Sequence, residues 1–410
     1  MSSVFYDINN PRPNTLTFRL SPTHCSYANT LRRLCMTSVK CVGFNADIKD
    51  DGSTSDVKIL ANSTPMTNEM LAHRIGLLPI HVENPLEFNP ENYEFSLSII
   101  NDSNTSRDIT ASDIVVREKK GDDFVDIPSS TFFKPHPLTR QTPLIAVLKP
   151  LLPGGQPEEI RFTAKASIGT GLQSARWIPT TQCAYSYTLD TNPENQEKAF
   201  NEWLNRNKKI MDPVSLKEKE PEKRKSLWKE YQTLEINRCY LKNADGEPES
   251  FDFTVESAGV LSPAYIIEKA CEGGEIMCKQ FAGESLSDDV TVDPADGSIR
   301  GWDFIFQRQD HTLGNCIQTW LDLNRVGVND ITFAGYDVPH PLRNEMVIRI
   351  GCPEEAGARR VLREAMVACG AMFASWKESW KAKGAGPVQG PSGVNKPRVL
   401  RPIQKPKLKA

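Results

Sequence analysis

Polar and apolar residues alternate in short runs through much of the first 260 residues, which is typical of half-buried β-strands. TLTFRLS near the start and FDFTVES near residue 251 show the alternation most clearly. Between them, runs such as FSLSII and IRFTAKA are separated by Gly, Pro, Asn and Asp. The pattern predicts a β-rich insert domain at 49–175. An outer unit formed by 1–48 and 176–285 surrounds it.

Three segments carry apolar residues at the i, i+3, i+4 spacing of an amphipathic helix. The first begins after the N-cap candidate Ser26, and the second runs from Ser262 to about Phe281, interrupted by Gly273 and Gly274. The third, from about Pro353 to Lys381, has the longest apolar stripe: Val361, Leu362, Ala365, Met366, Cys369, Met372, Phe373, Trp376 and Trp380. So apolar a stripe cannot stay in water, and it therefore predicts a large helix contact.

The third helix closes a second compact unit, 300–381, in which WDFIFQ, ITFAGYDV and MVIRIG alternate as strands. Residues 286–299, with four aspartates and two serines, are expected to be a linker, and residues 193–232 an exposed, partly helical segment. The unit repeats the strand–helix order of the chain's start: with Asn29 aligned on Asn315, Leu31 falls on Ile317. The fold class expected is therefore α+β, with two related units.

Length and composition narrow the class of protein. A chain of 410 residues can form two or three domains with real cores, and 25% charged residues are ordinary for a globular protein. The best apolar run, Leu144–Leu148, is far shorter than the ~20 residues of a membrane span. The first residues lack the features of a secretory signal, and ten cysteines without short spacing suggest reduced thiols inside a cell.

Charge is unevenly distributed along the chain. Residues 381–410 hold eight basic residues and no acidic one, whereas the remainder holds 41 basic and 52 acidic residues. An acidic body is poorly suited to gripping nucleic acid over its whole surface. The tail, 382–410, has no core-forming pattern and is expected to be disordered and basic.

Four motifs in a fixed order carry a family resemblance. STPMTNEMLAHRIGLLPI, AKASIGTGLQSARWIP and FTVESAGVLSPAYII resemble elements of the third-largest subunit of eukaryotic RNA polymerase II, its D-type counterpart in archaea and the bacterial α subunit. HTLGN followed by AGYDVPHP resembles the small partner of that subunit, called L in archaea. Ser174 stands where the family has a histidine. The chain thus resembles a fusion of two polymerase subunits, as in large DNA viruses of eukaryotes.

The resemblance implies two α-subunit-like dimerisation domains packed as an intramolecular pseudo-dimer, the first interrupted by the insert. It also implies a non-catalytic platform on which the two large catalytic subunits of a DNA-directed RNA polymerase assemble. Small subunits would dock on the N-terminal half, and DNA or RNA would be met only through the complex. No membrane contact or homo-oligomer is expected, and the site of action would be a host cytoplasm, a virion or the nucleus.

By the same resemblance, two sets of residues are candidates for contacts. One set is expected to dock a large polymerase chain: Arg32, Arg33, Glu69, His73, Arg74, Arg176 and Trp177. The other is expected to form the intramolecular dimer interface: Leu31, Leu34, Leu313, Ile317, Trp320, Leu321, Phe373 and Trp376. For Arg32 and Arg33, the alternative is a merely solvated helix face.

Nothing in the sequence predicts chemistry by the chain itself. The stretch HVENPLEFNPENYEF, where some relatives carry metal-binding cysteines, has none, and no C-x-x-C occurs, so neither a metal nor another cofactor is expected. His73, His81, His311 and His340 lack an acid–nucleophile constellation. A rival from another class is a nucleic-acid-binding or virion structural protein that acts through the basic tail. A stand-alone hydrolase would need a pocket of titratable groups.

Overall fold

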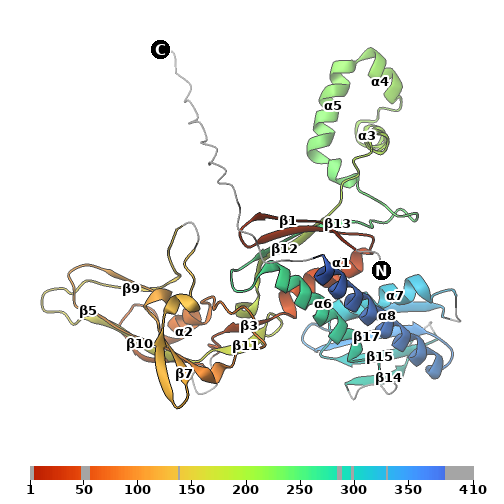
Figure 1. The fold of residues 1–410 in the computed structure, drawn as a ribbon. Helices are drawn as coiled ribbons and strands as arrows, with labels where there is room; N and C mark the ends of the chain where they lie inside the picture. Colours follow the sequence, from red (N-terminus) through yellow and green to blue (C-terminus); the bar gives the residue numbers. More distant parts are fainter. Residues whose placement is uncertain are drawn as a thin grey trace, which may run out of the picture.

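The computed structural model describes residues 4–47, 56–136, 139–283, 289–296, 300–328 and 331–383. Figure 1 shows a body built from the two ends of the chain, a β-rich insert to one side, and a helical arm that projects from the body. Helices and antiparallel sheets are segregated within each part, so the α+β class is confirmed. The expected tail lies, from residue 384 on, outside the described residues.

The first unit is a four-stranded antiparallel sheet covered on one face by two helices. Its strands run in the order β1 (Phe5–Arg12), β2 (Thr15–Leu20), β13 (Phe251–Ser257) and β12 (Thr180–Tyr187). The helices are α1 (Cys25–Thr37) and α6 (Pro263–Lys279). Strand β1 was not expected, because FYDINNPR is mostly polar and buries little besides Phe5.

Local capping decides where these helices begin. Ser262 caps α6 as expected, accepting from the backbone N–H of Tyr265 at 3.3 Å. Helix α1 starts earlier than expected, since His24 and not Ser26 is its N-cap: the His24 imidazole accepts from the Ser26 backbone N–H at 3.1 Å. Ser26 is thereby placed inside the helix, with its hydroxyl directed toward the second unit.

The insert has its own core and two sheets. Strands β4 (Val57–Asn62), β10 (Glu158–Ala164), β5 (Tyr93–Asn101), β7 (Val115–Lys120) and β8 (Asp123–Ile127) form the larger sheet in that order. Strands β6 (Arg107–Thr110) and β9 (Leu144–Leu148) form the smaller one, beside helix α2 (Asn68–Gly76). Phe95, Phe132 and Phe133 lie at the centre of this core.

A pair of short strands joins the insert to the body. Strand β3 (Lys40–Gly43) pairs with β11 (Ser167–Thr170), although the sequence assigned β11 to the insert and β3 to the outer unit. Cys41 of β3 packs into the core of the body, whereas Val42 packs into that of the insert. The boundary therefore runs along this ladder and not at a single residue.

The charged segment 193–232 folds as the helical arm of Figure 1. It consists of α3 (Pro193–Lys208), α4 (Pro213–Lys219) and α5 (Pro221–Leu234). Phe200, Trp203 and Tyr231 form a small core that is separate from the other two. An isolated bridge between Leu189 and Tyr240 ties the arm's two ends together near the body.

The second unit repeats the plan of the first with fewer parts. Its sheet runs in the order β14 (Val290–Pro294), β15 (Trp302–Gln307), β17 (Glu345–Gly351) and β16 (Phe333–Asp337). Helices α7 (His311–Asn324) and α8 (Glu355–Ala382) cover one face. The predicted linker at 286–299 is wrong in its centre, because Val290–Pro294 pairs along β15 as an edge strand. Its four aspartates and its proline hid the two apolar valines.

The two units share one hydrophobic core. Buried residues from the first sheet, from the second sheet and from all four covering helices belong to a single cluster. Figure 1 shows α1, α6, α7 and α8 side by side between the two sheets, and helix pairs across the units, α6 with α8 and α1 with α7, are in contact. The arrangement is a four-layer pseudo-dimer within one chain.

Candidate functional site

The closest approach of the two units lies between α6 and α8, which we call the seam. Phe373 of α8 is fully buried against Gly274 of α6. A Cβ atom on Gly274 would come within 2.7 Å of the Phe373 ring, closer than real contacts allow. Gly274 interrupts the apolar stripe of α6 in the sequence, and in the structure it creates the room for this aromatic ring.

The C-terminal part of α8 inserts two tryptophans among aromatic residues of the first sheet. The Trp380 ring lies 4.9 Å from Phe5 and 5.4 Å from Phe18, both edge-on, and its indole N–H donates to the Ala264 carbonyl at 3.1 Å. Trp376 lies 6.3 Å from Phe5 and 5.3 Å from Phe373. Such edge-to-face pairs add to the stabilisation from apolar burial. Helix α8 thus reaches the far edge of the first sheet.

A partly buried ion pair crosses the same seam. Lys377 Nζ of α8 lies 2.7 Å from a Glu275 carboxylate oxygen of α6, and both side chains are less than one-fifth exposed. Hydrogen bonds from Lys279 and Lys377 hold the pKa of Glu275 below its usual range. In turn, the bond to Glu275 raises the pKa of Lys377. Both groups stay charged near neutral pH.

Helices α1 and α7 meet through polar contacts beside apolar ones. The Ser26 hydroxyl lies 2.8 Å from that of Thr319 and 3.3 Å from the Asn315 amide oxygen. The Arg33 guanidinium donates to the Thr312 hydroxyl and to Asp310, each at 2.8 Å. Burial would raise the pKa of Asp310, but hydrogen bonds from Thr312 and Arg33 outweigh it and lower that pKa. Arg33 was expected to point outward. That expectation is wrong, because its guanidinium group donates to Thr312 and Asp310 of the second unit.

The other interface candidates lie in the shared core. All but one are buried, namely Leu31, Leu34, Leu313, Ile317, Leu321, Phe373 and Trp376. Trp320 is half-buried at the edge of that core, where the Arg325 guanidinium stacks 5.1 Å from its ring centroid. The sequence missed Gly274, Lys377 and Trp380 as interface residues. Trp380 could have been predicted from its place in the apolar stripe of α8. No pattern in the sequence indicated that Gly274 or Lys377 lies at the interface.

The docking candidates on α2 divide into two kinds. Glu69 and His73 are exposed, beside the exposed apolar side chains of Met70 and Leu77. Arg74 instead donates to the backbone carbonyls of Leu144 and Ile145, each at 2.9 Å. These two bonds fasten α2 to β9. Arg74 therefore positions the helix, while the neighbouring face stays open.

Arg176 and Trp177 lie inside the joint between the insert and the body, next to the paired strands β3 and β11. The Arg176 side chain is 7% exposed and donates to Phe44, Asn45 and Asp47. The Trp177 ring packs over Gly169 and Gly43, where any side chain would collide with it. Their expected role in docking a large polymerase chain is corrected accordingly: both brace the joint between insert and body.

Arg32 remains at the surface. Its Nε donates to the Asn29 side chain at 2.9 Å, and its guanidinium borders an open pocket of about 790 Å³ along β12. Tyr185 and Tyr187 form part of the wall of this pocket. Of the two adjacent arginines, only this one is directed away from the pseudo-dimer.

No metal site is visible among the described residues, in which no group of three His, Cys, Asp or Glu side chains is arranged to hold an ion. The cysteines are free thiols and most are buried. His81 and His311 serve structural contacts, to the Gly259 carbonyl at 2.8 Å and to the Tyr336 hydroxyl at 3.3 Å. None of the helices in the described parts is long and apolar enough to cross a membrane.

Comparison with known proteins matches both units to the same description. Residues 17–274 and residues 302–379 each match the RNA polymerase Rpb3/Rpb11 dimerisation domain. The chain is 24% identical over 253 residues to DNA-directed RNA polymerase subunit Rpo3 of Methanosphaera stadtmanae, covering 60% of this chain and 86% of that protein. It is 24% identical over 287 residues to DNA-directed RNA polymerase II subunit RPB3 of Schizosaccharomyces pombe, covering 65% and 82%. With the first match spanning more than half of its length, the chain belongs to the RNA polymerase Rpb3/Rpb11 dimerisation domain family.

Proposed function

We propose that this protein is the non-catalytic assembly platform of a multisubunit DNA-directed RNA polymerase. Several of its curated relatives are named polymerase subunits. One observation carries the finer part of the proposal: two dimerisation-domain matches occur on one polypeptide, and their helices bury a common core. The chain then does alone what two paired subunits do, namely present a preformed surface to the two large catalytic subunits.

Fusion has a thermodynamic rationale. The segment between α6 and β14 spans about ten residues, so the effective concentration of one unit near the other is on the order of millimolar. Pairing then no longer depends on how much of each chain is made. Because the facing helices are already buried against each other within one chain, we propose a monomeric platform and not a homo-oligomer.

The proposed partners are the two largest polymerase subunits and the small subunits that dock on the N-terminal half. The exposed face of α2, with Glu69 and His73, and the Arg32 surface support the first of these contacts. DNA and RNA are met only through the assembled complex. By its resemblance, the fused arrangement is that of large DNA viruses of eukaryotes, and we propose action in the host cytoplasm or virion, with the nucleus as the alternative.

Copurification tests the partners. Affinity-tagged chain expressed in its native setting should capture the two catalytic subunits, identified by mass spectrometry. Arg32→Ala should reduce their recovery while the chain stays folded, because this half-buried side chain bonds its own helix neighbour Asn29 and not the second unit. A chain ending at residue 383 should recover both subunits in full. Recovery of nucleic acid or capsid proteins in their place, lost with the tail, would favour the rival structural or nucleic-acid-binding role.

Splitting the chain tests the fusion. A break within 284–288 leaves β14 with its own sheet, so residues 1–283 and 289–383 should form a 1:1 complex when expressed as two chains. Size-exclusion chromatography with light scattering measures the stoichiometry. Two monomers, or two separate homodimers, would rule out the fused-heterodimer interpretation while leaving family membership intact.

A further inference from the structure

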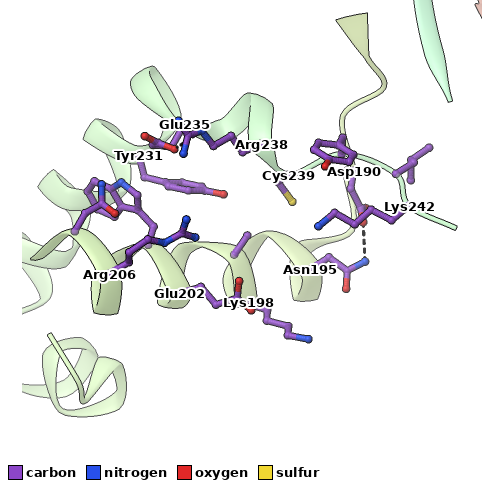
Figure 2. Close-up of a pocket in the computed structure, with 15 residues that line it drawn as sticks. Asp190, Asn195, Lys198, Glu202, Arg206, Tyr231, Glu235, Arg238, Cys239 and Lys242 are labelled. Atoms are coloured by element: carbon purple, nitrogen blue, oxygen red, sulfur yellow. Dashed lines mark hydrogen bonds and ion pairs between the residues drawn. The ribbon is translucent and has the colours of Figure 1, made fainter. Parts of the chain in front are cut away.

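A cavity at the base of the helical arm has no role in the pseudo-dimer. Its volume is about 480 Å³, within the range of ligand-binding pockets, and it is enclosed by α3, the end of α5 and the segment returning to the body. Figure 2 shows side chains from both sides of this opening directed toward one another. It lies at the base of the arm that projects from the body in Figure 1.

Tyr231 supplies a hydroxyl at the wall of the cavity, on a ring that is itself buried. Its side chain is 2% exposed and packs between Phe200, Trp203 and Trp228. Its hydroxyl points into the open space (Figure 2), and no hydrogen bond to it is present among the described residues. Burial, helped by Cys239 and Glu235, raises the pKa of Tyr231, so the hydroxyl is a neutral donor at pH 7. The hydroxyl oxygen is reached by solvent through the cavity, so it is free to donate to a ligand there.

Three of the four cations that line the cavity lack a carboxylate partner among the described residues, whereas two of its three acids are already engaged. Asp190 accepts from the Asn195 side chain at 2.7 Å, and Glu235 pairs with Arg238 at 2.9 Å. Arg206 and Lys242 have no carboxylate partner within the part of the chain that the structure describes. Glu202 is the remaining carboxylate. With Lys198 also in the lining, the wall therefore offers three cations without a carboxylate partner among the described residues, one hydroxyl and one free carboxylate.

We propose that this cavity binds a carboxylate-bearing segment of a partner polypeptide. The partner's Asp or Glu side chain is held by Arg206, Lys242 and Tyr231, and a backbone N–H beside it donates to Glu202. Planar guanidinium groups and carboxylates match in geometry, which favours such a pairing. A nucleic-acid strand fits less well, because successive phosphates would meet Glu202, Glu235 and Asp190 and would offer no donor to them. The proposal is independent of the polymerase assignment.

Fluorescence anisotropy of a labelled probe tests the site on the purified full chain. The probe is an acetylated, amidated pentapeptide of two glutamates flanked by glycines. Arg206→Gln should weaken its binding by at least about fivefold, and Tyr231→Phe by about two- to fivefold, since each removes one hydrogen bond to the carboxylate. Glu202→Gln should leave binding equal or tighter, because it removes a like charge but keeps an oxygen acceptor.

Lys225→Gln provides a matched control, because it removes an exposed positive charge from α5 outside the cavity and should not alter binding. Free glutamate should compete at least tenfold more weakly than the peptide; equal competition would assign the site to a small amino acid. Stronger competition by a single-stranded oligonucleotide, or weaker peptide binding by Glu202→Gln, would overturn the proposal. So would equal loss in Arg206→Gln and Lys225→Gln. Circular dichroism confirms that each variant is folded.

Discussion

The seam between the two units and the helical arm are both built from helices with buried aromatic residues, but they use them differently. At the seam, Phe373 and Trp380 are covered by residues more than 90 positions away in the chain, including Gly274 and Phe5. In the arm, Phe200 and Trp203 are covered by Trp228 and Tyr231, all within one short segment. The seam thus links distant parts into one cooperative unit, whereas the arm stabilises only itself.

The largest effect is expected at the centre of the seam. Phe373→Ala should lower the free energy of unfolding by about 3–5 kcal/mol, because it removes a fully buried ring and leaves a cavity between α6 and α8. Denaturant titration followed by circular dichroism measures it. Val367→Ala, at an exposed position of the same helix, serves as the control and should change stability by less than ~0.5 kcal/mol. Similar losses in both would mean that the seam is not the tight contact described.

Two glycines on facing helices allow a sharper test of close packing. Gly274→Ala should destabilise by about 1–3 kcal/mol, since its new methyl group would collide with the Phe373 ring. Gly370→Ala places the same group 3.4 Å from the Cys278 Cβ, an ordinary contact, and replaces a poor helix former by a good one. We expect it to be neutral or stabilising. A thermal melt of each variant compares them, and an inverted order would contradict the geometry.

The ion pair across the seam predicts a pH dependence of moderate size. The pKa of Glu275 is lowered in the folded chain, so its contribution is fully present above about pH 4.5 and is lost as the pH falls through the folded-state pKa. Glu275→Gln should therefore cost roughly 1–2 kcal/mol at pH 7, and the difference from the unmodified chain should shrink below pH 4. Glu378→Gln, at an exposed site on α8, should show no such trend. Urea titrations from pH 3 to pH 7 measure both.

The smallest effect is expected from removing the arm. Replacing 193–235 by a short Gly/Ser linker should change the unfolding free energy of the body by less than about 1 kcal/mol, because the arm's core is separate and closure entropy varies slowly with loop length. Calorimetry of the shortened chain tests this. A large drop in melting temperature would show that the arm and the body are energetically coupled after all.

Periodicity predicted elements best where a long apolar stripe must find a partner. The α8 stripe correctly indicated that Phe373 and Trp376 are buried, and the alternation of FDFTVES indicated β13. It failed where an edge strand is mostly polar, as in β1, or where two valines lie among turn-forming residues, as in β14. Edge strands bury only part of one face, so their pattern is weak.

The individual contacts of polar residues could not be predicted from the sequence. Arg33 and Arg32 are adjacent and chemically identical, yet one bonds Asp310 across 277 positions and the other stays at the surface. Which of them turns inward depends on the register of α1 against α7, a property of the assembled core. Arg176 illustrates the same limit, because its partners Phe44 and Asp47 become neighbours only when β3 pairs with β11.

The contact between Phe5 and Trp380 also has a consequence for synthesis of the protein on the ribosome. The first strand meets the last helix, and these residues are separated by nearly the whole described chain. Translation at about 5–20 residues per second therefore leaves roughly 6–25 s between completion of the first sheet, at β13, and the end of α8. Contacts so distant in sequence also form slowly after release. During that interval the nascent chain presents an apolar surface, which makes it a natural client for chaperones.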